Sequence, residues 1–132
     1  MENPSIMSHV SVGASDPARA QAFYDRVLAT IGAKRVLEEH GAVAYGKLFP
    51  EFWVQAPFDG GPRGVGNGTH FAFVADSREA VEAFHAEALA AGGTDDGPPG
   101  PRPQYGPQFY GCYVRDLDGH KIEATFWDES AG

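Results

Sequence analysis

Three residues in this sequence could bind a metal ion, although they lie far apart in the chain. Glu123 stands between Ile122 and Ala124, in an apolar stretch that alternates like a β-strand. An ionised carboxylate in such a place is costly unless a cation or strong hydrogen-bond donors meet it. His9 and His70 are the best candidates to approach Glu123, joined to it through a metal ion.

The alternation of residue types predicts that these three side chains share one face of the sheet. Residues 5–12 and 69–75 alternate between apolar and other residues, which is the period of a half-buried strand. If the apolar residues face the helices, then His9, His70 and Glu123 point to the opposite face. Two imidazoles and one carboxylate are the set favoured by Fe(II), which Zn, Ni or Mn can also occupy. We therefore expect one divalent metal ion, and the alternative is a hydrogen-bonded polar cluster.

An internal repeat indicates how the chain positions these residues. A shift of 61 residues aligns the first half with the second without a gap and places His9 on His70. Each half predicts a strand, an amphipathic helix and three further strands. Such a repeat decides the fold before any single element does. We expect an α+β fold with a single domain, residues 1–132, built from two paired βαβββ modules at about residues 1–57 and 68–128.

Local signals mark the ends of the two helices. Asp16 followed by Pro17 is typical of a helix start, because an oxygen-bearing side chain caps the first turn and proline suits its backbone. Gly32 predicts the end of the first helix. In the second module, Asp76 with Glu79 three residues later resembles a capping box.

The segment at residues 94–108 departs from the repeat because it contains five prolines. It cannot be a central strand throughout, and Pro-rich loops of this length are often lids or binding loops. Arg102 and Tyr105 within it are either substrate contacts or surface residues. His40 and His120 lie in or beside turns, and we expect both to face solvent.

Two paired βαβββ modules, with a histidine on the first strand of each and an acidic residue on the last strand, resemble the vicinal oxygen chelate superfamily. That superfamily holds the glyoxalases, bleomycin resistance proteins and extradiol dioxygenases. The resemblance covers nearly the whole chain and is carried by His9, by His70 and by residues 113–123, which end in Glu123. It implies that the two sheets wrap into an open barrel with the metal on its concave face.

The sequence also departs from patterns of that superfamily. Trp53 stands where the resemblance places a fourth, glutamate ligand of glyoxalases, and an indole cannot bind a metal. Gln55, two residues further on the same face, could supply an oxygen ligand, or water could complete the coordination. Tyr113 matches the extradiol dioxygenase signature, but Leu117 replaces its proline and no histidine stands near residues 104–106.

Two functions fit these observations. The first is a metal-dependent enzyme of lyase, isomerase or dioxygenase type, in which a small substrate binds the metal through vicinal oxygens and Tyr113 donates or shuttles a proton. The alternative is a bleomycin-resistance-type module that sequesters a small aromatic ligand without catalysis. Metal content would separate the two. The expected substrate contacts are Trp53, Gln55, Arg102, Tyr105, Phe109 and Trp127.

Composition narrows the range of partners. The net charge is -8 and the ten Lys and Arg residues are scattered, which argues against a nucleic-acid partner. No apolar run approaches the roughly 20 residues of a membrane span, and residues 1–4 lack the pattern of a secretory signal. Cys112 is the only cysteine, which fits a reducing compartment, so we expect a cytoplasmic protein. The sheet edge at the module junction predicts a homodimer.

Overall fold

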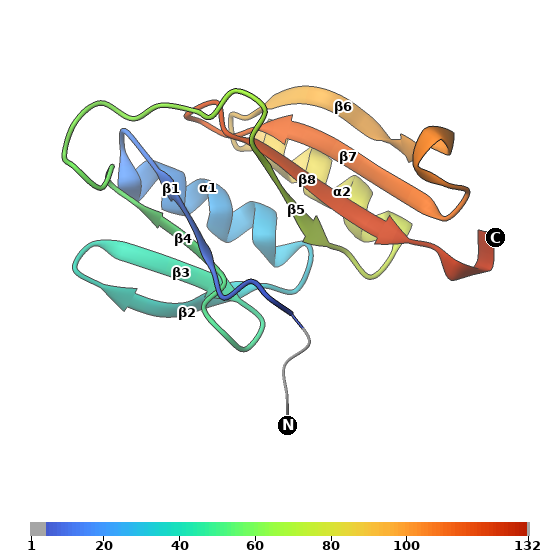
Figure 1. Ribbon diagram of the computed structural model, residues 1–132, viewed down its shortest axis with the longest axis horizontal. Coiled ribbons are helices and arrows are strands. Elements are labelled where there is room, and N and C mark those ends of the chain that lie inside the picture. Colours follow the sequence, from blue (N-terminus) through green and yellow to red (C-terminus); the bar gives the residue numbers. More distant parts are fainter. Residues whose placement is uncertain (1–4, 132) are drawn as a thin grey trace.

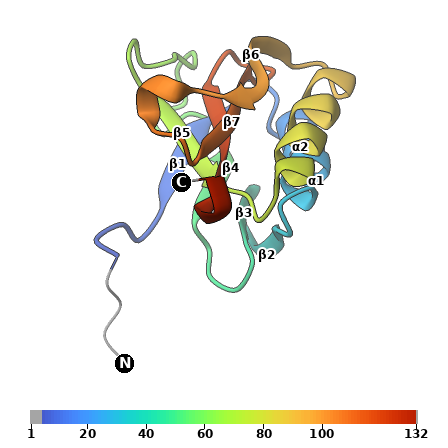
Figure 2. The ribbon, with the colours of Figure 1, turned by 90° about the vertical axis from the view of Figure 1, so that its right-hand side faces the viewer.

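The computed structural model describes residues 5–131 as two βαβββ modules, with both helices on the same side of the strands (Figures 1 and 2). Residues 1–4, where the sequence predicts no secretory signal, and residue 132 lie outside the described part. The first module contains β1 (Val10–Gly13), α1 (Pro17–Ala29), β2 (Lys34–Glu39), β3 (Ala42–Gly46) and β4 (Phe52–Gln55). The second contains β5 (His70–Val74), α2 (Arg78–Ala90), β6 (Thr94–Pro101), β7 (Phe109–Arg115) and β8 (Lys121–Trp127), with short 3-10 turns at Pro103–Tyr105 and Glu129–Ala131.

Each module forms its own four-stranded sheet, in the order β1-β4-β3-β2 and β5-β8-β7-β6. The first and last strands of each module pair in parallel, which places Ser11 opposite Trp53 and Ala72 opposite Glu123. Ser11 and Ala72 are 61 residues apart, so Trp53 and Glu123 occupy equivalent places in the repeat. The predicted α+β fold of paired βαβββ modules is confirmed, and the two sheets do not close into a barrel.

The helix starts follow local capping chemistry. The Asp16 carboxylate accepts a hydrogen bond from the Arg19 backbone N–H at 3.2 Å, as the sequence predicts for α1. For α2 the predicted cap is wrong by one residue, because the Ser77 hydroxyl accepts from the Ala80 backbone N–H at 3.1 Å. Asp76 instead forms an exposed ion pair with Lys47.

The hydrophobic core lies between the helices and the two sheets and runs from one module into the other. The Phe52 ring of β4 packs edge-on against Phe71 and Phe73 of β5, with centroids 6.2 Å and 5.1 Å apart. The fully buried rings of Tyr24 and Phe84 belong to the same cluster. Because α1 and α2 also contact each other, the modules share one core.

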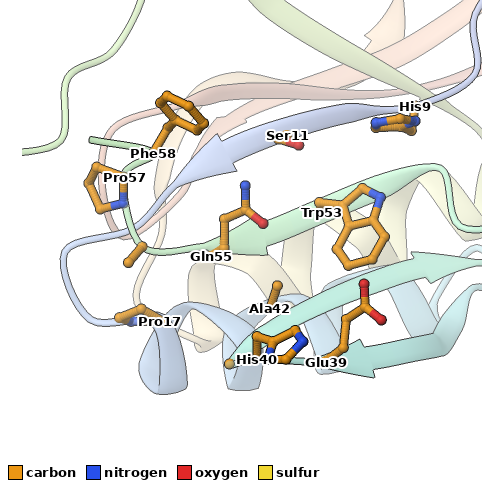
Figure 3. Close-up of a pocket in the computed structure, with 12 residues that line it drawn as sticks. His9, Ser11, Pro17, Glu39, His40, Ala42, Trp53, Gln55, Pro57 and Phe58 are labelled. Atoms are coloured by element: carbon orange, nitrogen blue, oxygen red, sulfur yellow. The ribbon is translucent and has the colours of Figure 1, made fainter. Parts of the chain in front are cut away.

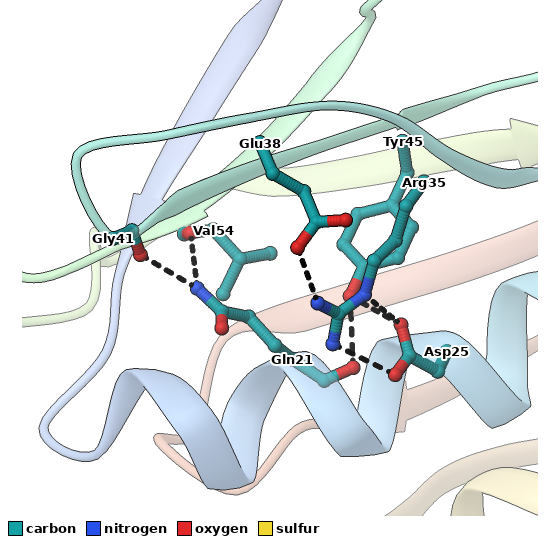
Figure 4. A network of polar contacts seen from close by, with 7 residues as sticks. All are labelled: Gln21, Asp25, Arg35, Glu38, Gly41, Tyr45 and Val54. Atoms are coloured by element: carbon teal, nitrogen blue, oxygen red, sulfur yellow. Dashed lines mark hydrogen bonds and ion pairs between the residues drawn. The ribbon is translucent and has the colours of Figure 1, made fainter.

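Polar contacts fix α1 on the first sheet (Figure 4). The Gln21 amide donates to the carbonyl oxygens of Gly41 and Val54, and the Tyr45 hydroxyl donates to the Gln21 carbonyl and to Asp25. Burial, followed by the contact with Asp25, raises the pKa of Tyr45, so its hydroxyl stays a donor. These contacts leave the opposite face of the sheet open.

The turn between β7 and β8 ties the second module to the first. The Asp116 carboxylate accepts hydrogen bonds from the backbone N–H groups of Asp118 and His120, both at 2.9 Å, and from the Tyr24 hydroxyl of α1. The Asp118 carboxylate accepts from the Ser15 backbone and hydroxyl at 3.0 and 2.7 Å. Both carboxylates are buried, so the turn anchors the two modules on each other.

The expectation that His120 faces solvent is wrong. Its side chain is buried, and Nε2 donates to the Gly13 carbonyl oxygen of the first module at 2.7 Å. The turn folds back onto the loop between β1 and α1, and a turn motif alone does not reveal this tertiary contact. His40 is exposed, as expected.

Half of the Pro-rich segment is a strand. Within the described residues β6 pairs with β7 alone, and it contains two register shifts, between Asp95 and Gly97 and between Gly97 and Gly100. An edge strand tolerates prolines, because the outer side of its backbone needs no N–H donor. The sequence predicts a mobile rim at residues 98–107, of which the part up to Pro101 belongs to β6, and the mobility of the rest stays a prediction.

Candidate functional site

The carboxylate of Glu123 is buried on the open face of the second sheet. Its residue is only 5% exposed, and Oε1 lies 3.0 Å from Nε2 of His70. The Thr125 hydroxyl donates to the other carboxylate oxygen, Oε2. His70 begins β5, which lies beside β8, so the parallel pairing of these strands brings the imidazole to the carboxylate. The structure thus unites two of the three predicted ligands.

The donor set of this pair fits a divalent metal. An imidazole nitrogen and a carboxylate oxygen are ligand types that Zn and Fe(II) accept. In the structure these two atoms lie 3.0 Å apart, at hydrogen-bond distance. Thr125 holds the second carboxylate oxygen and so orients the first. Thr125 is a further residue of this site, and its position two residues after Glu123 is the sequence signal that places it on the same face.

Tyr113 completes the polar part of this face. It stands opposite Glu123 in the pairing of β7 with β8, and its ring lies edge-on to His70 with centroids 6.2 Å apart. Burial and the negative charge of Glu123 raise the pKa of Tyr113. Its hydroxyl is therefore protonated at neutral pH and available as a donor.

Arg102 lies beside Tyr113, with its guanidinium carbon 5.7 Å from the ring centroid. Its donors reach the carbonyl oxygens of Pro98 at 2.7 Å and Gly100 at 3.0 Å. The side chain therefore holds the Pro-rich segment in place, and a role in substrate binding stays a prediction.

Three predicted aromatic contacts gather at the other end of the same face. Phe109 and Trp127 stand opposite each other on β7 and β8, and the Tyr105 ring packs edge-on against Phe109 at 5.2 Å. Tyr105 and Trp127 are about half exposed. Both strands carry these rings four residues from Tyr113 and Glu123, and residues four apart on a strand share a face.

His9 lies with the first module. The strand predicted at residues 5–12 begins only at Val10, because residues 5–9 pair with no strand in the described part of the chain, so His9 precedes β1. Its Nδ1 lies 3.0 Å from the Ser8 hydroxyl. Figure 3 shows His9 with Trp53 and Gln55 around a cavity of about 670 Å³ on the first sheet.

His70 borders different hollows from His9. Among residues 5–131, no group of three or more His, Cys, Asp or Glu side chains is placed to hold a metal ion. The chain brings His70 and Glu123 together but does not add His9 to them, so the three-ligand site stays a prediction. Trp53 and Gln55 do share one face, as expected.

Two βαβββ modules side by side, with a histidine and a carboxylate on an open sheet face, define the glyoxalase fold. The family model described as Glyoxalase/Bleomycin resistance protein/Dioxygenase superfamily matches residues 6–124, and the chain belongs to this family.

Solved structures agree with this assignment. A glyoxalase/bleomycin resistance protein from Albidiferax ferrireducens T118 is 37% identical, with a TM-score of 0.84 over 92% of this chain and 98% of the other. A lactoylglutathione lyase from Agrobacterium tumefaciens is 25% identical, with a TM-score of 0.63 over 95% of each chain. The fosfomycin resistance protein FosX from Listeria monocytogenes, 19% identical with a TM-score of 0.65 over 96% of this chain and 97% of the other, shares the fold. No curated protein matches the sequence.

None of the helices in the described part of the chain is long and apolar enough to cross a membrane.

Cys112 is buried, and burial raises the pKa of its thiol to about 11, which leaves the thiol protonated at neutral pH.

Proposed function

We propose that the protein is a cytoplasmic, metal-dependent enzyme of lyase, isomerase or dioxygenase type that acts on a small substrate with two vicinal oxygens. One divalent ion, Fe, Zn, Ni or Mn, is held by His9, His70 and Glu123. The observation that carries this proposal is the buried Glu123 carboxylate 3.0 Å from the His70 imidazole on an open sheet face. The likeness to a lactoylglutathione lyase supports an enzyme over a binding module.

The side chains of the face have distinct tasks in this proposal. When bound, the ion supplies a Lewis acid that polarises a substrate oxygen. Tyr113 donates a proton to the reacting group, since its hydroxyl stays protonated next to Glu123. Thr125 keeps the Glu123 carboxylate in one orientation. The aromatic residues Phe109 and Trp127 contact the apolar part of the substrate.

A second copy of the chain supplies the missing ligand. His9 lies on the first module and His70 with Glu123 on the second, so a two-fold symmetric dimer can bring the first module of one chain to the second module of the other. Such an arrangement builds two identical sites. The exposed side chains of Ile6 and Met7, which precede His9, offer apolar surface for this contact. Trp53, Gln55, Arg102 and Tyr105 would then contact the substrate from both chains.

Metal content tests the proposal. Wild type, His9→Ala, His70→Ala and Glu123→Gln are prepared alike, and metal per chain is measured by elemental analysis. We expect near-stoichiometric metal in wild type and loss in all three variants, with circular dichroism unchanged. Lys34→Met, which alters an exposed charge on β2, is the control. Retention of metal in one variant removes that residue from the site, and a wild type that binds no metal favours a sequestering module.

A further inference from the structure

A second pocket lies next to the His70–Glu123 pair, at the end of the second sheet where β7 ends and β5 and β8 begin. It has a volume of about 420 Å³ and is bounded by residues 65–70, Arg115 and Lys121. The connection between the modules reaches this end of the sheet (Figure 1), and the Val65 side chain approaches the backbone at Gly119.

The charge of this pocket is positive, although the whole chain carries -8. Arg115 and Lys121 both contribute to its wall, and none of the described residues that line it is acidic. The two cations share one carboxylate outside the wall, since Asp96 Oδ2 lies 3.1 Å from Arg115 Nε and 3.5 Å from Lys121 Nζ. Asp96 carries one negative charge and the two side chains carry two positive charges, so this carboxylate leaves one positive charge without neutralisation.

Hydrogen-bond donors remain available in this pocket. Arg115 uses Nε for Asp96 and Nη1 for the Gly119 carbonyl oxygen. Its Nη2 donates to no residue within the described part of the chain. A guanidinium group with a free edge and an ammonium group beside it are suited to bind the oxygens of a carboxylate, phosphonate or phosphate.

The loop over the pocket depends on glycine for its shape. The Thr69 backbone N–H donates to the Gly66 carbonyl oxygen at 3.1 Å. Gly68 has a φ of +94°, a conformation that favours glycine. A Cβ on Gly66 would lie 2.4 Å from the Thr69 hydroxyl, so a larger residue there would force the turn to shift. The turn brings the polar side chains of Asn67 and Thr69 to the pocket wall, and the two glycines beside them add no side chains there.

This pocket adjoins the proposed metal site through His70. His70 lines the pocket and also contacts Glu123, and the Lys121 ammonium lies 4.8 Å from the centroid of the Tyr113 ring. We propose that residues 65–70, Arg115 and Lys121 bind an oxyanionic group of the substrate. The substrate is then an anion, and the two vicinal oxygens that bind the metal lie next to this group. This inference rests on the proposed function, because it assigns the neighbouring face to the same substrate.

The test uses phenylphosphonate as the probe and protein treated with a chelator, so that its result does not depend on the metal. Binding is measured by calorimetry and by amide chemical shifts. We expect shifts centred on residues 66–70 and Lys121, and no binding of the uncharged dimethyl ester of the probe. Lys121→Met removes one charge-assisted contact and should weaken binding about tenfold or more.

Two further variants complete the test. Asp96→Asn removes the carboxylate that competes for both cations, so it should tighten binding, a change that general damage to the fold would not produce. Lys34→Met, which removes a distant exposed charge, should leave the affinity unchanged. The inference is overturned if Lys121→Met binds as well as wild type, if Lys34→Met weakens binding equally, or if the shifts lie elsewhere. Metal binding without anion binding refutes this inference alone, whereas anion binding without metal refutes the metal site alone.

Discussion

The two modules are alike on the side that faces the helices and different on the open side. Equivalent positions of β4 and β8 carry Trp53 and Glu123, while the neighbouring Phe52 and Ile122 are both buried in the core. The repeat therefore constrains the face that packs and leaves the other face free to change. The second module offers a carboxylate with an imidazole, and the first offers a cavity lined by His9, His40 and Trp53.

The turns before these strands differ in the same way. In the first module the turn between β3 and β4 exposes Leu48 and Phe49 by 74% and 67%, whereas Asp116 and Asp118 of the second are 6% and 4% exposed. The turn of the second module anchors the modules on each other, and that of the first is open to solvent. This difference can be tested by substitution.

The largest effect on stability is expected from Asp116→Ala. It removes the acceptor of two buried backbone N–H groups and of the Tyr24 hydroxyl. Leaving buried donors unpaired costs about 1–3 kcal/mol each, so we expect a loss of about 3 kcal/mol in the free energy of unfolding, measured in urea. Leu48→Ala in the exposed turn should cost less than about 0.5 kcal/mol. Equal losses in the two variants would contradict the comparison.

A pH-dependent effect is expected from Asp118. Burial opposes ionisation, but the hydrogen bonds from Ser15 and the charge of Arg63 outweigh it and lower the pKa of Asp118. A pKa below the unfolded value of about 3.9 means that the ionised group contributes stability above that pH, and this contribution is lost as the pH falls through the folded value.

The matching measurement compares wild type with Asp118→Asn in urea from pH 7 to pH 3. Wild type should be the more stable at pH 7, and the difference should narrow below about pH 4. If the free energies of unfolding of the two proteins change in parallel over this pH range, the charge of Asp118 does not help to hold the modules together.

The smallest expected effect is a difference in amide hydrogen exchange between the outer strands of the two sheets. β2 has one register shift, between Arg35 and Leu37, whereas β6 has two and is followed by Pro103–Tyr105 in a short turn. We expect the amides that follow Pro101 to exchange faster than those of β5, because few backbone hydrogen bonds protect them. Arg102→Ala should speed exchange in β6 near Gly100, since Arg102 holds the carbonyl oxygens there. Exchange as slow as that of β5 would rule out a mobile rim.

Much of the fold and part of the site follow from the sequence. The shift that places His9 on His70 predicted the paired modules, and strand alternation predicted that His70 and Glu123 share one face, where the structure brings them into contact. Period-two patterns specify a face but not the distance between two sheets, so they could not reveal that His9 stays apart from His70. The burial of His120 was missed for a similar reason, since its partner is a backbone carbonyl in the other module.

In the proposed dimer, one metal site combines His9 of one chain with His70 and Glu123 of another. The most direct test mixes two metal-free variants, His9→Ala and Glu123→Gln, unfolds and refolds them together, and measures bound metal per chain. A mixed dimer contains one intact site, formed by His9 from the Glu123→Gln chain and His70 with Glu123 from the His9→Ala chain. We expect the mixture to regain metal although each variant refolded alone binds none. A mixture as empty as its two components, beside a wild type that refolds with metal, would contradict the shared site.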